Sequence, residues 1–325
     1  MQTRQDHDPA ILAAIRKNSV HLDADESIFF ARQLEHIKTT VFEVAYPLMK
    51  ARDLIPISTE ADPADEWITY DMYDKMGLAR VVRDYAKDFS RIDVSGKQFF
   101  AKVVSLGDGF GYSVQELRAS RKTGKPLDQK RAAAAQEAAR RLENWLAWFG
   151  NAEDDQQGLL NHSNINIVSV TTDGSGSSGL WSKKTPQQIL RDLNQIAWNA
   201  FIQTKGIEMS DTILVSPAIW ALLTTTMVST LATKTILQFF RESNPQIKSV
   251  EWLNELSLYP LGTGSYDSVF AYTRDPMKVT LEIPQDFEMF PPQEEGMEFK
   301  VPCHSRFGGV LMPKPMSASR ADNIL

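Results

Sequence analysis

Two strand-like runs separated by a charged segment constrain the fold of this chain more than any other feature. "WITYDMY" at residues 67–73 and "FFAKVVSL" at residues 99–106 are rich in β-branched and aromatic residues, whereas residues 83–97 are rich in charged ones. This pattern predicts a long β-hairpin with its charged part near the far end. A two-stranded ribbon alone is marginally stable in water. We therefore expect the hairpin to need a partner.

Residues 128–149 predict a helix about 30 Å long, at a rise of about 1.5 Å per residue. Asp128 is a good N-cap after Pro126, and Gly150 stands where a C′ glycine belongs. The segment has no histidine, cysteine, serine or threonine, so no chemistry is expected of it. Alternating spacings of three and four predict one buried stripe, made of Ala135, Ala138, Leu142, Trp145 and Phe149.

Length and composition point to a soluble protein with one large or two medium-sized domains. The 325 residues can bury a substantial core, and no stretch approaches the roughly 20 apolar residues of a membrane span. The single cysteine, Cys303, excludes an internal disulfide and fits the cytoplasm. With 35 basic and 41 acidic residues, the formal charge of −6 argues against tight, sequence-independent binding of nucleic acid.

The order of the remaining segments predicts an α+β chain. Residues 1–25 are polar and indicate an arm, and residues 26–38 have the apolar spacing of a helix. "TTDGSGSSG" at residues 171–179 predicts a flexible connector and the best internal boundary. After it, strands and helices alternate as in an α/β domain, and beyond Pro284 short strands lead to a polar tail.

The helix that follows the connector is well specified. Thr185 and Gln188 predict a capping box, Pro186 takes the first helical position, and Gly206 ends the helix. Its predicted buried face consists of Ile189, Leu193, Ile196, Ala200 and Phe201.

No motif in the chain carries recognisable cofactor or nucleophile chemistry. "GDGFG" at residues 107–111 and "GSGSSG" at residues 174–179 lack the dinucleotide fingerprint and the P-loop lysine. If "EFKVPCH" is extended, Cys303 and His304 point to opposite faces and cannot readily pair as a thiol and its base. A structural cysteine is the favoured interpretation.

An acidic group after the long helix is the best candidate for a metal. Glu153, Asp154 and Asp155, with Asn161 and His162, offer oxygen and nitrogen ligands, but their spacing fits neither an EF-hand nor a zinc site. A solvated turn is the favoured interpretation, so we expect no cofactor and no metal. A hydrolase or metal-dependent enzyme using His162 or Cys303 remains an alternative.

Several runs of the chain resemble the major capsid proteins of tailed bacteriophages, which have the HK97-like fold. The runs include "RIDVSGKQF" (91–99), "GYSVQELRASRKTGKPLDQKRAAAA" (111–135), "WFGNAEDDQQGLLNH" (148–162) and "VPCHSRFGGV" (301–310). The resemblance extends from about residue 50 to the C-terminus. It implies a non-enzymatic protein that assembles into pentamers, hexamers and an icosahedral shell around double-stranded DNA.

The resemblance also assigns a role to each segment. It implies an N-terminal arm and helix (1–45), an extended β-hairpin loop (67–112) and an α/β axial domain (185–277). The peripheral domain would combine residues 46–66, residues 113–184 with the long helix 128–149 as its spine, and return strands and a tail at 278–325.

A subunit interface is expected along the charged part of the hairpin, where interspersed charges would select partner and register. The side chains concerned are Arg80, Arg83, Asp84, Lys87, Asp88, Arg91, Asp93 and Lys97. The expected partners are other copies of the chain, with scaffolding, portal and decoration proteins as further candidates, weak contact with DNA and no membrane. The protein would be made in the host cytoplasm and end in the virion. An encapsulin-like compartment that encloses protein cargo is the alternative within the same fold.

Overall fold

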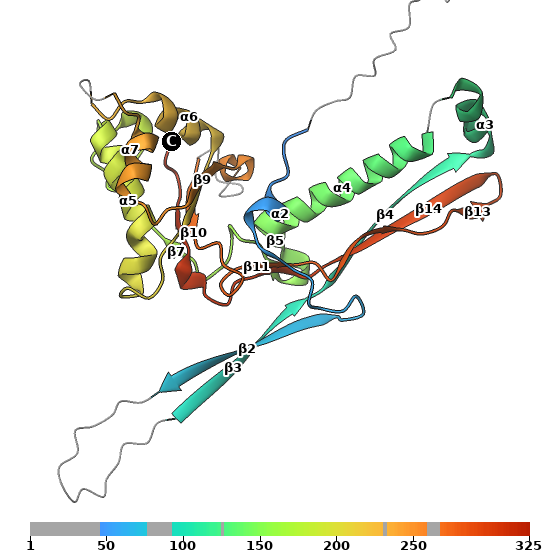
Figure 1. Cartoon of the computed structure of the whole chain (residues 1–325), viewed down its shortest axis with the longest axis horizontal. Helices are drawn as coiled ribbons and strands as arrows, with labels where there is room; N and C mark the ends of the chain where they lie inside the picture. The colour runs from blue at the N-terminus through green and yellow to red at the C-terminus, as the bar shows by residue number, and fades with distance from the viewer. Residues whose placement is uncertain (1–45, 77–92, 125–126, 230–232, 259–266) are drawn as a thin grey trace, which may run out of the picture. The chain divides into compact units, whose positions relative to one another are not determined.

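The computed structural model describes residues 46–76, 93–124, 127–229, 233–258 and 267–325. The six α-helices in these ranges (Figure 1) are α2 Ala51–Leu54, α3 Val114–Thr123, α4 Leu127–Phe149, α5 Pro186–Gln203, α6 Pro217–Thr225 and α7 Ile236–Ser243. The strands are β1 Ile57–Ser58, β2 Trp67–Met76, β3 Asp93–Lys102, β4 Val104–Ser113, β5 Gly150–Asn151, β6 Gln156–Gln157, β7 Asn166–Ile167, β8 Thr212–Val215, β9 Ser249–Trp252, β10 Val269–Tyr272, β11 Thr280–Glu282, β12 Gln285–Met289, β13 Gln293–Glu295, β14 Glu298–Phe307, β15 Gly309–Leu311 and β16 Ser319–Ala321.

The predicted hairpin is a two-stranded antiparallel ribbon of β2 and β3, paired from Trp67↔Lys102 to Met76↔Asp93. The single predicted strand at residues 99–106 is wrong, because the chain leaves the ribbon after Lys102. The N–H of Val103 donates to the carbonyl of Glu66 (2.9 Å), and β4 then begins at Val104. β4 pairs along its whole length with β14 (Figure 1), so residues 104–112 belong to a second sheet.

Helix α4 packs on β4 and β14, and its observed bounds agree with the predicted ones within one residue. The predicted buried stripe is wrong. Ala135 and Phe149 are buried, but Ala138, Leu142 and Trp145 are exposed. The last two turns bury Leu146, Ala147, Trp148 and Phe149 instead, all within one large hydrophobic cluster. Trp148 has no exposed surface, whereas Trp145 is 41% exposed and contacts the Phe149 ring, with the two ring planes tilted by 46°.

The C-terminal end of α4 is closed by a tight return of the chain. The N–H groups of Leu159 and Leu160 donate to the carbonyls of Ala147 (2.8 Å) and Trp148 (3.0 Å). A Cβ on Gly158 would lie 2.4 Å from the Trp148 carbonyl group, so this approach requires glycine. The predicted C′ residue Gly150 has the left-handed φ of +68° that the motif demands.

A buried amide fastens α4 to its surroundings. The Asn144 side-chain oxygen accepts from the backbone N–H of Ala51 (3.0 Å) and from the indole N–H of Trp148 (3.2 Å). Its amide nitrogen donates to Glu255 (2.5 Å), a buried side chain whose pKa is raised by burial. Three segments far apart in sequence therefore meet at one satisfied polar group.

A five-stranded sheet in the order β7-β16-β10-β8-β9 separates two hydrophobic cores. Alternate residues of β8 and β10 point to opposite faces, as in any strand. Leu214, Phe270 and Tyr272 belong to the first core with α4, whereas Ile213 and Ala271 belong to the second core. Helices α5, α6 and α7 supply most of the second core, so the two cores share this sheet as a common wall.

The predicted polar tail at the C-terminus is wrong, because Ser319–Ala321 forms β16 in the interior of that sheet, between β7 and β10. Ala321 and Ile324 are buried in the second core. The guanidinium of Arg320 donates to the carbonyl of Leu160 and pairs with Asp322, which allows a charged residue to be buried there.

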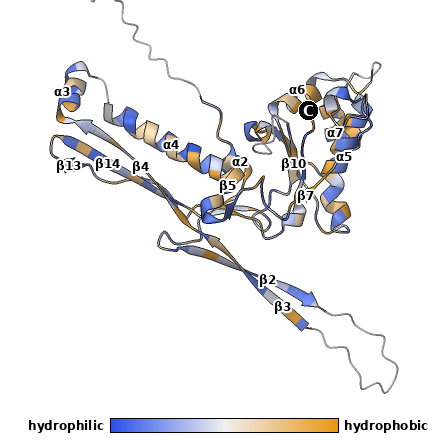
Figure 2. Cartoon of the chain, turned by 180° about the vertical axis from the view of Figure 1, so that it is seen from behind, coloured by the Kyte–Doolittle hydropathy of each residue, from blue (hydrophilic) through white to orange (hydrophobic). Residues whose placement is uncertain are grey.

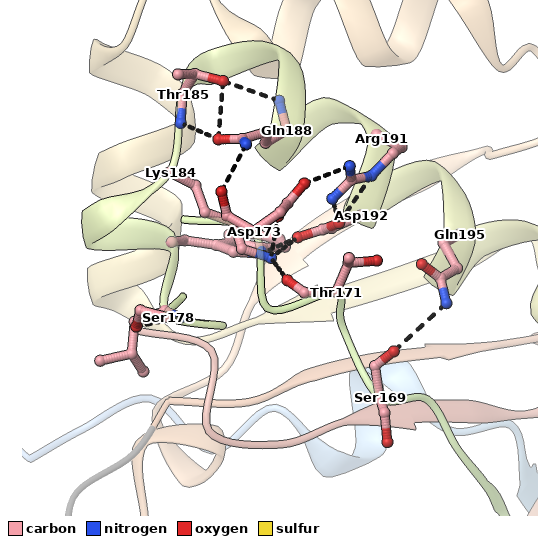
Figure 3. A network of polar contacts seen from close by, with 12 residues as sticks. Ser169, Thr171, Asp173, Ser178, Lys184, Thr185, Gln188, Arg191, Asp192 and Gln195 are labelled. Atoms are coloured by element: carbon pink, nitrogen blue, oxygen red, sulfur yellow. Dashed lines mark hydrogen bonds and ion pairs between the residues drawn. The ribbon is translucent and has the colours of Figure 1, made fainter. Parts of the chain in front are cut away.

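Residues 171–179, predicted as a flexible connector, are held on α5 by a polar network (Figure 3). Lys184 and Asp192 form a fully buried ion pair, and the Lys184 ammonium also donates to the carbonyl of Thr171 (2.6 Å). Arg191 joins Asp173 (2.6 Å) to Asp192 (2.7 Å). The predicted capping box of Thr185 and Gln188 is confirmed at the start of the same helix.

Of the buried face predicted for α5, Ile189, Leu193, Ile196 and Ala200 are buried, but Phe201 is exposed. Phe201 lies in the last turn, where it makes an edge-on contact with Trp198. The prediction therefore holds for the helix except at its end.

Trp148→Ala should lower the free energy of unfolding of the isolated subunit by about 3–5 kcal/mol, because it removes a fully buried indole and leaves a cavity. Trp145→Ala, the matched control one turn away, should cost about 1–2 kcal/mol, because it removes the tilted ring contact with Phe149 and a partly buried side chain. Urea titrations of both variants give the comparison. A larger loss for Trp145→Ala would contradict the burial assigned here.

Asp173→Asn should destabilise the subunit in a pH-dependent way. Hydrogen bonding to Arg191 lowers the pKa of Asp173 from 3.8 to about 2. The ionised carboxylate therefore stabilises the folded chain at pH values above the pKa that Asp173 has in the unfolded chain. This contribution is lost as the pH falls from about 4 towards 2. The difference in melting temperature between wild type and variant should be large at pH 7 and should shrink at pH 3. Asp71→Asn on the ribbon is the control, and a constant difference at both pH values would refute the linkage.

Candidate functional site

Cys303 and His304 do not come together as a nucleophile and its base. Both lie on the extended strand β14, as predicted, so their side chains point to opposite faces of the sheet. Cys303 is buried beside Ala135 of α4 and Val301, and burial together with the nearby Asp108 carboxylate raises its pKa. A raised pKa disfavours the thiolate, which is the nucleophilic form.

The acidic group after α4 forms a turn. Asp154 accepts from the Lys102 ammonium (2.6 Å) and from Asn151 (2.7 Å), while Asn161 donates to the carbonyl of Phe149 (2.6 Å). Within the described ranges, no three histidine, cysteine or acidic side chains are arranged to hold a metal ion. His162 lies at the edge of this turn, and burial lowers its pKa. These residues fasten the end of the helix.

A hollow of about 600 Å³ lies at the base of the ribbon. Tyr70, Met72 and Phe99 line it from one ribbon face, and residues 308–316 and His162 line it from the other side. Tyr70 and Phe99 stack with their ring centroids 5.2 Å apart. The hollow therefore has aromatic side chains on the ribbon side and a mixed polar and apolar lining on the other side.

The other ribbon face is the strongest candidate for a functional surface. Its register brings Trp67, Tyr73, Val94 and Phe100 to one side, and these side chains are 55–68% exposed. Figure 2 shows a mixture of hydrophilic and hydrophobic residues along both strands of this ribbon. Large exposed apolar patches on a soluble protein mark interaction sites. The ribbon can bind another polypeptide through this face.

The eight charged residues predicted for the interface are only partly described. Arg80, Arg83, Asp84, Lys87, Asp88 and Arg91 lie outside the described residues. Asp93 and Lys97 are exposed on β3, and the Lys97 ammonium lies 4.9 Å from the centre of the Phe99 ring. Their role at an interface stays a prediction.

The sequence predicts an interface at the charged residues of the hairpin, and that prediction did not include the exposed aromatic face of the ribbon. The signal was present, because Trp67 and Tyr73 are six residues apart in a strand and must share a face. Phe100 could be added only with the register of the two strands. In the described ranges, no helix is long and apolar enough to cross a membrane.

Cys303 should react slowly with a maleimide dye in the folded chain. Its burial and raised pKa should make labelling at pH 7 about 100-fold slower than after unfolding in urea. An exposed cysteine at Gln98→Cys, placed in a Cys303→Ala background, is the control for accessible thiols. Rapid labelling of the folded wild type would revive the interpretation of Cys303 as a nucleophile.

One of the comparisons with known proteins identifies a family. A family model described as major capsid protein matches residues 77–324, which is most of the chain. No curated protein sequence is similar enough to this chain to be matched.

Solved structures with this fold come from phage capsids and related particles. The capsid of Myoviridae phage XM1 aligns with a TM-score of 0.78 at 14% identity, over 92% of this chain and 99% of that one. Mycobacterium phage Ogopogo gives 0.59 at 10% identity, over 91% and 99%. A virus-like particle from Pyrococcus furiosus gives 0.51 at 14% identity, over 85% and 92%. Identities this low establish the fold alone.

Proposed function

The chain belongs to the major capsid protein family, and from this premise we propose that it builds the icosahedral shell of a tailed-phage head from pentamers and hexamers around double-stranded DNA. The predicted HK97-like α+β fold is confirmed. The proposal is carried by one observation. The β2–β3 ribbon presents an exposed aromatic face that another copy of the chain can cover.

The contact between the ribbon and another copy of the chain is expected to be a large, stable interface. A two-stranded ribbon is marginal by itself, and obligate interfaces supply the missing stability by burying apolar surface. Charges such as Asp93 and Lys97 would set the register of the contact, and the aromatic face would supply most of its free energy.

We assign the segments accordingly. The ribbon is the extended loop, and the first core with α4 as its spine is the peripheral domain. The second core with α5, α6 and α7 is the axial domain. Because β16 lies in the sheet between the two cores, the C-terminal residues join the axial side and do not form a free tail.

The role proposed here is structural and needs no catalyst or cofactor. The opposed directions of Cys303 and His304 on β14 support it. Copies of the chain are the main partners, and the virion is the destination. Scaffolding, portal and decoration proteins remain candidate partners. The net charge of −6 supports weak contact with the packaged DNA.

The compartment alternative receives less support. It depends on a cargo-docking pocket near the helix predicted at residues 26–38, which lies outside the described residues. The Pyrococcus furiosus particle shares the fold at a TM-score of 0.51, well below the 0.78 of the phage XM1 capsid. Both the family model and the structural likeness favour the phage-type shell.

The double variant Tyr73→Lys/Phe100→Lys should abolish assembly while changing the stability of the subunit by less than about 1 kcal/mol, because both side chains are exposed. Size-exclusion chromatography with negative-stain microscopy measures assembly, and urea titration measures stability.

Ile207→Lys/Met277→Lys is the control, since these apolar side chains are 75–78% exposed and are not part of strands β2 and β3. Shells formed by the ribbon variant at the wild-type yield would exclude the ribbon as the main contact. A wild-type chain that stays monomeric at every concentration would exclude the shell itself.

A further inference from the structure

Helix α3 lies beside the β13–β14 turn at one end of the β4–β14 sheet (Figure 1), where the N–H of Val114 donates to the carbonyl of Met297 (3.1 Å). The helix has a capping box of Ser113 and Glu116 and a left-handed C-cap at Gly124, yet none of its ten residues is buried. Helices shorter than about 12 residues are marginal without packing. The caps specify α3, and its outer surface is left for another contact.

The outer surface of α3 is basic. Glu116 faces α4, where it pairs with Arg131 (2.9 Å). Successive helical residues turn by about 100°, so Arg118, Arg121 and Lys122 gather on the side away from Glu116. All three are exposed, and in the described part of the chain no acidic side chain forms an ion pair with them.

An acidic hollow of about 680 Å³ lies on the other side of the helix. Its lining includes Glu116, Arg131, Glu295, Met297 and Glu298. Arg131 pairs with Glu116, and Lys300 on β14 pairs with Glu295. Glu298 adds a further exposed carboxylate, and Met297 exposes 68% of its surface. The three glutamates of the lining outnumber Arg131 and Lys300, so the hollow keeps a net negative charge beside the exposed Met297 side chain.

We propose that the acidic hollow of one copy receives the basic face of α3 from a second copy. Within one copy the two surfaces face in different directions, so they cannot neutralise each other. A contact between unlike surfaces is heterologous, and its repetition closes a ring or extends a chain of subunits. Complementary charge fixes the register of such a contact, and Met297 supplies apolar surface to bury. The inference rests on the proposed function, since it names a second pair of surfaces that joins the copies.

A charge-swap experiment on the full-length chain tests the contact. The basic-reversed variant is Arg118→Glu/Arg121→Glu/Lys122→Glu, and the acid-reversed variant is Glu295→Lys/Glu298→Lys, which changes two exposed carboxylates of the hollow. Each should raise the protein concentration needed for half-maximal assembly by about tenfold or more, because like charges then meet. The variant carrying both sets should return this concentration to within about threefold of wild type, since the complementarity is restored with its signs exchanged.

The controls separate this contact from folding and from net charge. All five side chains are exposed, so urea midpoints should match wild type in every variant. Glu153→Lys/Lys183→Glu exchanges one exposed acid and one exposed base away from this site, and it should assemble like wild type. Added salt should weaken the wild-type contact through screening.

Each outcome decides something. Normal assembly of either reversed variant would overturn the contact and leave the proposed function standing. Loss of assembly in both reversed variants without recovery in the combined one would overturn the pairing of these two surfaces. A wild-type chain that remains monomeric would overturn both this inference and the proposed shell. The contact is supported only if assembly recovers in the variant that carries both sets of charge reversals.

Discussion

The burial of the last two turns of α4 is the constraint on which the first core depends. Trp148 fills the interior, and Asn144 beside it accepts from the backbone N–H of Ala51 and donates to one carboxyl oxygen of Glu255. Unpaired polar groups at this depth would cost several kcal/mol. The C-terminal end of α4 therefore fixes the positions of three other segments. These are α2, the turn at Gly158 and the segment around Glu255. The first turns of α4 instead cover the sheet, through Ala135.

The shared sheet ties this core to the second one. Strands β8 and β10 are buried on both faces, so each of their apolar residues contributes to one core or the other. A change at Leu214 acts on the first core and a change at Ile213 acts on the second, although they are adjacent in sequence. Close packing transmits small displacements across such a wall, so the two cores constrain each other.

Features that depend on local chemistry could be predicted from the sequence. The capping box at Thr185, the glycine at residue 150 and the bounds of α4 are set by neighbours within a few residues. The buried face of α4 could not be predicted, because one stripe was assumed along a helix whose two halves pack on different surfaces. Strand β16 has no apolar run, and its burial depends on β7, some 150 residues earlier. The aromatic face of the ribbon required a register that only pairing supplies.

The ribbon also affects the interval between synthesis and assembly. Because the β2–β3 sheet has two strands in the described part of the chain, each strand has one edge that no other described strand pairs with. Edges of this kind can pair with any extended chain. The exposed aromatic residues stabilise such non-specific pairing, which leads to aggregation. A newly made subunit must meet a correct neighbour before it meets another exposed edge. The yield of usable protein is then decided by a competition between two rates, and a higher folding stability alone would not improve it.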